Sequence, residues 1–288
     1  MKYHILFNPL AGNGNCKEKV QSLIQEYKEN ALAHDMTKIK NYEDFIASLE
    51  VDDVIILCGG DGTLNRFIND TDGITIQNDI LYYASGTGND FLKDVEVQDN
   101  GKPFSIKKYI CDLPMVEVNG KQYRFLNNVG FGIDGYCCEV GDEMKKKTAK
   151  SVNYTSIAIK GLLFHYKPIG ATVVVDGKTY RYEKVWIAPT MKGRFYGGGM
   201  MPTPAQDRQA DDASLSLMMF HGSSKLQTLC IFPSLFKGEH IKHKKFVNIH
   251  TGKDIQVSFD KPTALQIDGE TISGVKSYHA MSKVKVSL

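Results

Sequence analysis

The chain has 288 residues, a formal net charge of +2 at pH 7 and 42% hydrophobic residues. This length permits one large or two medium domains with a substantial core, and a charge so near balance argues against nucleic acid as a partner. No apolar run approaches the ~18 residues of a membrane-spanning helix, and the chain starts directly with a strand rather than a signal peptide. The six cysteines show no zinc-ligand spacing, so we expect reduced thiols in a cytoplasmic protein.

The first hundred residues predict alternating strands and helices. The expected strands lie at 3–7, about 36–40, 53–58 and 80–84, and the expected helices at about 17–29, about 43–49 and from about 63 onward. Within the first helix, Val20, Leu23 and Ile24 follow the i, i+3, i+4 spacing of one apolar face. The pattern predicts an open, doubly wound α/β domain.

Three of these strands end in glycine-rich loops. In chain order the loops are 8–14, 59–63 and 85–91. The apolar run 54–58 before the second loop is unbroken, which is typical of a strand buried on both faces of a parallel sheet. Because parallel strands end at the same edge of a sheet, the loops are expected to meet there. Glycine loops and helix-start amides together favour a phosphate site.

Two simpler interpretations remain open for these loops. Neither G-x-G-x-x-G nor G-x-x-x-x-G-K-[ST] occurs in the chain, so neither common phosphate-loop pattern is present. Three glycines after a strand can form an ordinary tight turn, and Thr63 can be the N-cap of its own helix. The repetition at three strand ends favours the nucleotide site.

After residue 105 the sequence shows the signals of antiparallel sheets. Asn119-Gly120 and Asp176-Gly177 each separate two alternating runs, which is the strongest short-range sign of a β-hairpin. Further strands are expected near 185–189, 215–220, 245–250, 254–259 and 263–267, with helices at about 139–164 and 225–236. The second domain is therefore predicted to be a β-sandwich.

Taken together, these motifs resemble the diacylglycerol kinase catalytic domain family, the soluble bacterial lipid kinases related to sphingosine kinases and more distantly to NAD kinases. The matching segments are Asn8-Pro9 with Gly12, Gly59-Gly60-Asp61-Gly62-Thr63, the run 86–91 and Asp268-Gly269-Glu270. The resemblance implies an α/β nucleotide-binding domain over 1–108, completed by a C-terminal strand at 278–288. It implies a β-sandwich lipid-substrate domain over 109–277, in which the run 127–134 has a structural role.

The resemblance also implies roles for individual residues. Those expected on the ATP side are Asn8, Pro9, Gly12, Thr37, Gly59, Gly60, Asp61, Gly62, Thr63, Asn65 and Thr87. Glu270 is the implied base that takes the proton of the lipid hydroxyl, with Asp268 as its orienting or electrostatic partner. From the run 266–270 alone, an Asp-Gly hairpin turn with exposed charges is the simpler interpretation.

A magnesium ion normally accompanies ATP, and the resemblance places a structural site in the second domain. The implied ligands are Gln209, Asp212 and Ser214. Ala213 stands where the family usually has glycine, which puts this site in doubt. Asp211 and Asp212 can equally form a solvated pair in a loop, and Asp61 is a second carboxylate near the expected phosphates.

The implied activity is transfer of the γ-phosphate of ATP to a hydroxyl of diacylglycerol or a related lipid, giving a phosphatidic-acid-type product. The alternatives are a kinase for a sphingoid base, a polyprenol or a soluble dinucleotide, and a non-catalytic nucleotide- or lipid-binding relative. Asn89 is followed by Asp90 rather than glutamate, which argues against the dinucleotide. The basic runs 145–147 and 242–245 suit contact with anionic headgroups at the inner face of the membrane, and a homodimer is an open expectation.

Overall fold

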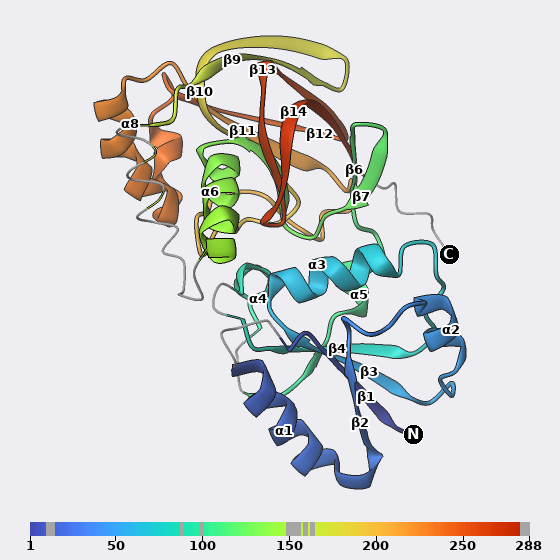
Figure 1. Ribbon diagram of the computed structural model, residues 1–288. Coiled ribbons are helices and arrows are strands. Elements are labelled where there is room, and N and C mark those ends of the chain that lie inside the picture. Colours follow the sequence, from blue (N-terminus) through green and yellow to red (C-terminus); the bar gives the residue numbers. More distant parts are fainter. Residues whose placement is uncertain are drawn as a thin grey trace. The chain divides into compact units, whose positions relative to one another are not determined.

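The computed structural model describes residues 1–9, 15–86, 89–97, 101–147, 157, 161 and 165–282. The chain divides into two compact units, Met1–Asp112 and Leu113–Leu288, and each unit is built on its own sheet (Figure 1). Among the described residues, no helix has the length and hydrophobicity that crossing a membrane requires.

The first unit is an α/β domain, in which the described residues form a five-stranded sheet of order β2-β1-β3-β4-β5. Its strands are β1 (Tyr3–Phe7), β2 (Ala31–Asp35), β3 (Val54–Gly59), β4 (Asp79–Ala84) and β5 (Phe104–Ser105). Its helices are α1 (Asn15–Tyr27), the 3-10 helix η2 (Lys28–Asn30), α2 (Tyr42–Ala47), α3 (Asp61–Asp70), α4 (Asp90–Asp94) and α5 (Lys107–Ile110). Strands β1 to β4 are parallel, and β5 is antiparallel to β4.

Helices cover both faces of this sheet, which confirms the predicted doubly wound arrangement. On one face, Val20 and Leu23 of α1 pack with Ile56 in an apolar cluster. Helix α3 lies on the opposite face (Figure 1), where Phe67 meets Tyr42 edge to face. Strand β3 is buried from both sides, as its unbroken apolar run predicts.

The second strand lies about five residues earlier than predicted. Strand β2 pairs with β1 in a register that sets Tyr3 opposite Ala31, whereas residues 36–38 form a turn. The alternation at 36–40 misled the prediction because Met36 is the only buried residue in that run. As an edge strand with Leu32 exposed, β2 carries no clear apolar pattern of its own. Helices α4 and α5 were not anticipated.

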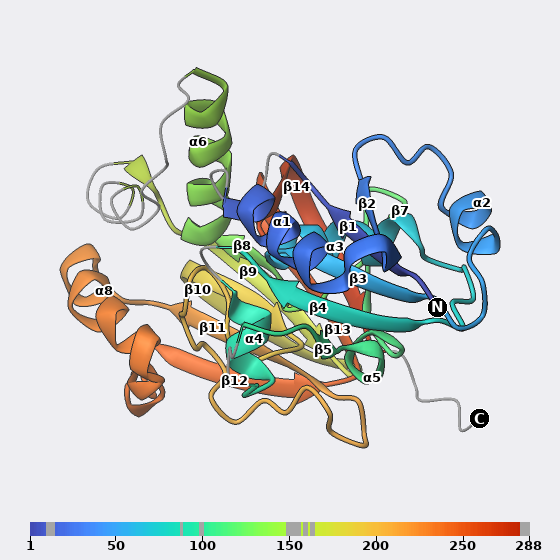
Figure 2. The same cartoon turned by 90° about the horizontal axis from the view of Figure 1, so that it is seen from below.

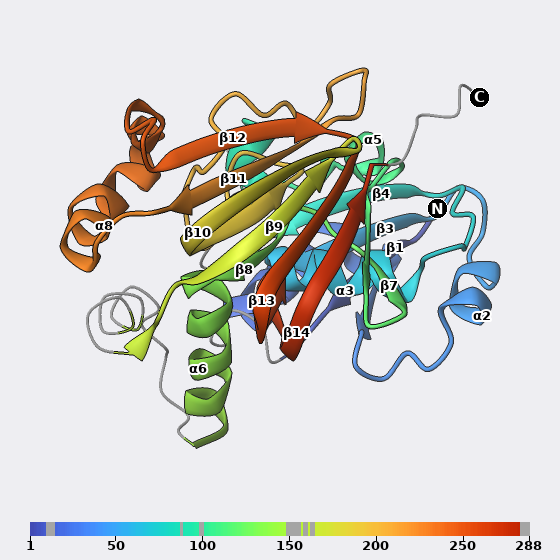
Figure 3. The same cartoon turned by 90° about the horizontal axis from the view of Figure 1, so that it is seen from above.

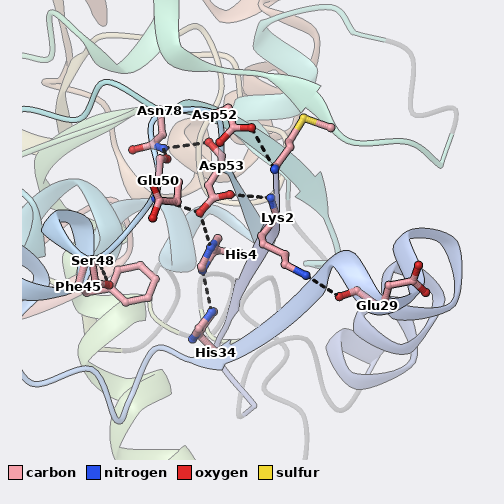
Figure 4. A network of polar contacts seen from close by, with 11 residues as sticks. Lys2, His4, Glu29, His34, Phe45, Ser48, Glu50, Asp52, Asp53 and Asn78 are labelled. Carbon is pink, nitrogen blue, oxygen red and sulfur yellow. Dashed lines mark hydrogen bonds and ion pairs between the residues drawn. The ribbon is translucent and has the colours of Figure 1, made fainter.

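A polar network ties the amino end of β1 to its neighbours (Figure 4). The buried Asp53 carboxylate accepts the backbone amide of Lys2 at 2.6 Å and faces Nε2 of His4 at 3.2 Å. Nδ1 of His4 lies 3.1 Å from Nε2 of His34 on β2. Because a carboxylate only accepts, His4 donates through Nε2, and a neutral His4 then accepts from His34.

The second unit is a β-sandwich-like domain with two hairpins at the predicted places. Its strands are β6 (Met115–Val118), β7 (Lys121–Arg124), β8 (Asn128–Gly132), β9 (Ile169–Val175), β10 (Lys178–Met191), β11 (Leu215–His221), β12 (Val247–Gly252), β13 (Asp254–Ile267) and β14 (Glu270–Met281). Its helices are α6 (Ile133–Lys147), α8 (Lys225–Ile231) and the 3-10 helices η4 (Phe232–Lys237) and η5 (Glu239–Lys242). The strand order among the described residues is β12-β11-β10-β8-β13-β14-β6-β7, and β9 pairs with β10 and β13.

The two longest strands of this unit change partners along their length. Strand β10 pairs with β9 in its first half and with β8 in its second, and β13 does the same (Figure 3). The sheet thereby folds around one apolar core, which includes Phe131, Leu217 and Val257. Both hairpin turns have the positive φ angles that Asn-Gly and Asp-Gly turns adopt, with Asn119 at 50° and Asp176 at 46°.

Several boundaries in the second unit differ from the prediction. One strand, β13, replaces the two expected at 254–259 and 263–267, and α6 begins at Ile133 rather than near 139. Most of the expected helix after residue 147 lies outside the described residues. Residues 278–281 belong to β14, whose partners are β13 and β6, and not to the first sheet. Residues 283–288 lie outside the described residues, so their return to the first domain stays a prediction.

Candidate active site

The loops after β3 and β4 pack backbone against backbone. A Cβ atom on Gly60 would lie 3.0 Å from Cα of Gly86, and one on Gly86 would lie 2.6 Å from Cα of Gly60. The amide of Ser85 donates to the carbonyl of Gly59 at 2.7 Å. Both positions need glycine because no side chain fits between the two loops. The loops therefore meet at the carboxyl edge of the sheet, where ligands bind in open α/β domains.

Asp61 joins these two loops. Its carboxylate oxygens accept the backbone amides of Asp90 at 2.8 Å and Phe91 at 3.0 Å, at the start of α4. The side chain therefore fixes the loop after β4 to the start of α3. A cation near Asp61 would have to share oxygens that already accept hydrogen bonds.

The amino end of α3 has no side-chain cap. Gly60, and not Thr63, is the N-cap residue, so the alternative role of Thr63 as an N-cap is wrong. Thr63 is buried, and its hydroxyl has no hydrogen-bond partner among the described residues. A Cβ on Gly62 would meet no described atom within 4 Å. An uncapped helix start with no described atom close to this Cβ position suits an anion.

The remaining residues expected on the ATP side are distributed around the same sheet edge. Asn8 and Pro9 directly follow β1, and Asn65 is buried on α3. Thr37 lies in the turn after β2, where its hydroxyl donates to Asp35 at 2.6 Å and lowers the pKa of that carboxyl. Gly12 and Thr87 lie outside the described residues.

Lys19 is a candidate that the sequence analysis missed. From α1 its ammonium group donates to the carbonyl of Ala84, the last residue of β4, and lies 5.0 Å from the ring centre of Tyr83. This places a positive charge beside the loop after β4. No short motif marks this lysine, because its position depends on how α1 packs against the sheet.

In the second unit, Asp268 and Gly269 form the tight turn between β13 and β14. Their φ angles are 48° and 91°, so the simple hairpin interpretation is correct for the backbone. The Asp268 carboxylate, however, is engaged rather than solvated. It accepts the amides of Leu126 at 2.5 Å, Asn127 at 2.7 Å and Asn128 at 2.9 Å. Such charge-assisted hydrogen bonds are short and strong, so they fix the turn.

Glu270, the candidate base, is exposed and is the first residue of β14. Gln266 supports the turn before it from the opposite strand. Its Oε1 accepts the amide of Gly269 at 2.9 Å, and its Nε2 lies 3.3 Å from Oδ2 of Asp134. A buried carboxyl group is therefore connected through one glutamine to the turn that presents Glu270.

Asp134 is the second residue that the sequence analysis missed, because it treated the run 127–134 as structural. It lies in the first turn of α6, where burial raises the pKa of its carboxyl group. Its carboxyl group lies close enough to the hydroxyl of Tyr196 for the two buried groups to interact. Burial and the nearby Asp134 also raise the pKa of Tyr196. The sequence signal that could have identified Asp134 is a single carboxylate within a run of glycines and apolar residues.

In the expected magnesium loop, Ala213 adopts a backbone conformation that favours glycine. Ala213 has a φ of 55°, the left-handed conformation that glycine adopts without strain. The exposed Asp212 accepts the amide of Ser214 at 3.0 Å, which lowers the pKa of its carboxyl. Gln206 donates to the carbonyl of Ser214 at 2.9 Å.

Few groups of this loop are available to coordinate a metal ion. The described residues contain no cluster of three or more His, Cys, Asp or Glu side chains that would hold a metal ion. One carboxylate with backbone carbonyls is compatible with Mg²⁺, which keeps several of its waters when bound to protein.

Arg208 connects this loop to the Asp268 turn. The buried guanidinium donates to the carbonyl of Leu126 at 2.6 Å and to the side chain of Asn127 at 2.7 Å. The amides of the same segment bind Asp268. Segment 126–128 is therefore the common anchor of the candidate base and the candidate metal loop.

Each of the two units matches a known protein family. Residues 2–112 match the diacylglycerol kinase catalytic domain, and residues 127–283 match the YegS C-terminal NAD kinase beta sandwich-like domain. The second match spans more than half of the chain, so the chain belongs to the family with the YegS C-terminal NAD kinase beta sandwich-like domain, and its first unit matches the diacylglycerol kinase catalytic domain. The resemblance inferred from the sequence motifs is thereby confirmed.

Similar proteins and structures extend this result. Proteins of Staphylococcus aureus strains JH9 and Newman, each named "Putative lipid kinase", are 28% identical over 244 residues, which span 81% of this chain and 73% of theirs. A diacylglycerol kinase structure from Bacillus anthracis str. Sterne matches with a TM-score of 0.61 and 17% identity, over 98% of this chain and 94% of that one. A second structure from that organism, titled "Crystal structure of a putative diacylglycerol kinase", has a TM-score of 0.66 and 18% identity, over 97% of this chain and 91% of that one. At these identities the structures show the fold alone.

Proposed function

We propose that the protein is an ATP-dependent lipid kinase that phosphorylates a hydroxyl of diacylglycerol or a related lipid, giving a phosphatidic-acid-type product. The observation that carries this proposal is the close packing of Gly60 on Gly86 beside the uncapped start of α3. This arrangement presents backbone amides to an anion at the edge where nucleotides bind in such sheets. The names of the staphylococcal relatives support a lipid as the acceptor.

The phosphates of ATP bind at the start of α3, in the space before Gly62. The buried hydroxyl of Thr63, which has no partner among the described residues, is available to donate there. Lys19 adds positive charge at the end of β4. The loop of Gln209, Asp212 and Ser214 would hold a structural Mg²⁺ ion, and the Mg²⁺ that accompanies ATP would supply charge that offsets the phosphate oxygens.

Glu270 acts as the base on the acceptor side. It takes the proton of the lipid hydroxyl while that oxygen bonds to the γ-phosphorus and the bond to the leaving ADP oxygen breaks. A carboxylate suffices because phosphoryl transfer depends more on positioning than on strong proton abstraction. Asp268 is a positioning residue, since its carboxylate is occupied by three backbone amides.

The test is transfer of labelled γ-phosphate from Mg-ATP to mixed micelles of diacylglycerol, sphingosine, ceramide or a polyprenol. We expect labelling of diacylglycerol, and a loss of about 10²–10⁴-fold in Glu270→Gln with unchanged ATP binding. Glu117→Gln, at an exposed glutamate of the same unit, is the matched control and should keep full activity. Equal loss in both variants, or none in either, would contradict the role of Glu270.

The same panel separates the alternatives. Labelling of sphingosine or the polyprenol instead of diacylglycerol would retain the kinase reaction and change the acceptor. ATP binding without transfer to any lipid would favour a non-catalytic relative. The left-handed conformation of Ala213 weakens that last alternative, because alanine takes here the conformation that glycine adopts without strain.

A further inference from the structure

Residues 225–245, which we call the projecting segment, form a helical excursion between β11 and β12. The segment comprises α8, η4, η5 and the three residues after them. All three views place it with α6 at one end of the strands of the second unit (Figure 1, Figure 2 and Figure 3). Its inner face is anchored, since Ile231, Phe232 and Leu235 are buried in one apolar cluster with Ile133 and Cys137 of α6.

Three large apolar side chains of the projecting segment are exposed. Leu226 is 70% exposed, Phe236 41% and Ile241 42%. Eight large hydrophobic side chains are exposed among the described residues, and three of them lie in this short segment. Single exposed apolar residues need no explanation, but a group of them on one excursion indicates an interaction surface.

The same segment concentrates positive charge. It contains five lysines, Lys225, Lys237, Lys242, Lys244 and Lys245, and one acidic residue, Glu239. The whole chain carries a formal net charge of only +2, so the rest of the chain is net negative. Lysines flanking exposed aliphatic and aromatic side chains are the composition of segments that lie at the surface of anionic membranes.

We propose that the projecting segment docks the protein on an anionic lipid bilayer. Leu226, Phe236 and Ile241 enter the interface, and the lysines contact the headgroups. The exposed apolar side chains favour a bilayer over a nucleic acid, which would need the charges alone. The biological role of this docking rests on the proposed function, because a lipid kinase must reach an acceptor that resides in a membrane. The shared cluster with α6 sets the docking surface beside the helix that carries Asp134.

The experiment measures binding of the full chain, without ATP, to sedimenting vesicles of phosphatidylcholine alone or mixed equally with phosphatidylglycerol. The charge variant is the triple substitution Lys242→Gln, Lys244→Gln and Lys245→Gln. Its matched control replaces the exposed Lys121, Lys253 and Lys261 of the same unit by glutamine. We expect the charge variant to bind the mixed vesicles about tenfold more weakly or less, and the control to stay within about twofold of the native protein.

A second variant tests the apolar contribution at constant charge. Leu226→Ser with Phe236→Ser should weaken binding to the mixed vesicles by about tenfold, because each side chain would otherwise bury apolar area in the interface. Its control is Leu32→Ser with Val51→Ser, two exposed apolar residues of the first unit. Circular dichroism of each variant checks that the fold is retained.

Three outcomes would overturn the inference. They are no binding of the native protein to mixed vesicles, equal losses in variants and controls, and stronger lysine-dependent binding to a DNA duplex than to vesicles. Transfer to a short-chain diacylglycerol in detergent micelles is measured in parallel and should be unchanged in both segment variants. Segment-dependent vesicle binding without any lipid phosphorylation would therefore refute the proposed function and leave the docking surface in place.

Discussion

The candidate residues of the two units are held in place in different ways. In the first unit, the loops after β3 and β4 meet because Gly60 and Gly86 have no side chains, and adjacent parallel strands bring them to one edge. In the second unit, the turn before Glu270 is held by the Asp268 carboxylate, whose partners lie 140 to 142 residues away in sequence. The arrangement in the first unit depends on two glycines that have no side chain, and the arrangement in the second unit depends on one charged side chain. Substitutions should therefore damage them differently.

The largest effect on stability is expected for Asp268→Ala. The substitution leaves the amides of Leu126, Asn127 and Asn128 without their acceptor, which should destabilise the second unit by about 3–5 kcal/mol. Trp186, the single tryptophan, is buried in this unit, so its fluorescence during urea unfolding reports the loss.

Asp260→Ala is the matched control for this substitution. Asp260 also makes two short hydrogen bonds, to Arg181, but both side chains are half exposed on the surface. Exposed ion pairs contribute little, so we expect almost no change in the unfolding midpoint. Equal destabilisation by the two substitutions would show that burial of the Asp268 contacts is not what matters.

The next largest effect is expected from alanine at one of two glycines of the first unit, Gly59, whereas alanine at Gly62 should be tolerated. In Gly59→Ala the new Cβ would lie 2.1 Å from the buried Oγ1 of Thr63, which should destabilise this unit by about 3 kcal/mol. Gly62→Ala meets no described atom within 4 Å, and alanine is the better helix former. We expect it to keep or raise stability while weakening ATP binding by about tenfold or more, because the methyl group occupies the space before the helix start.

Far-UV circular dichroism during thermal unfolding and fluorescence titration with an ATP analogue distinguish these two variants. Loss of ATP binding in Gly62→Ala with an intact melting curve would assign the open space to the nucleotide. Normal ATP binding by this variant would remove the start of α3 from the proposed site.

The same contrast between the two units explains which structural features could be predicted from the sequence. The strands β1, β3 and β4 and the hairpin turns at 119–120 and 176–177 follow from local patterns, namely apolar runs and Asn-Gly or Asp-Gly pairs. Each of these signals lies within about ten residues. The convergence of the glycine loops then follows from strand order alone, since parallel strands share one carboxyl edge.

The parts that could not be predicted depend on distant residues. No local pattern tells that the amides of segment 126–128 bind Asp268, or that Gln266 joins the turn to Asp134. The placement of β2 failed for a related reason, because an edge strand is defined by its pairing with β1 and not by its own burial. Lys19 likewise gains its position only when α1 packs on the sheet.

A smaller effect is expected for Ala213→Gly in the second unit. Alanine in the left-handed conformation is strained by about 1 kcal/mol relative to glycine, so the substitution should stabilise the loop by up to that amount. Greater freedom of the unfolded chain offsets part of the gain. Because the backbone already has the required shape, the magnesium dependence of kinase activity should change little. A large fall in the magnesium concentration needed for activity would mean that Ala213 distorts the loop.

The smallest effect is expected on the pH dependence of stability, to which one histidine of each unit contributes. Burial and the neighbouring His4 lower the pKa of His34, and burial with Lys178 lowers the pKa of His250. Each folded unit therefore favours a neutral ring. This contribution to stability is complete above the ordinary histidine value of 6.5 and is lost as the pH falls through the lowered folded pKa.

His34→Gln should flatten the decline in stability below pH 6.5 for the first unit only, and His250→Gln for the second only. Urea unfolding between about pH 5 and 8 tests this, within the range where histidines titrate and ordinary carboxyls do not. Trp186 fluorescence follows the second unit, and circular dichroism follows both. If His34→Gln changed the tryptophan transition as strongly as the dichroism, the two units would unfold together.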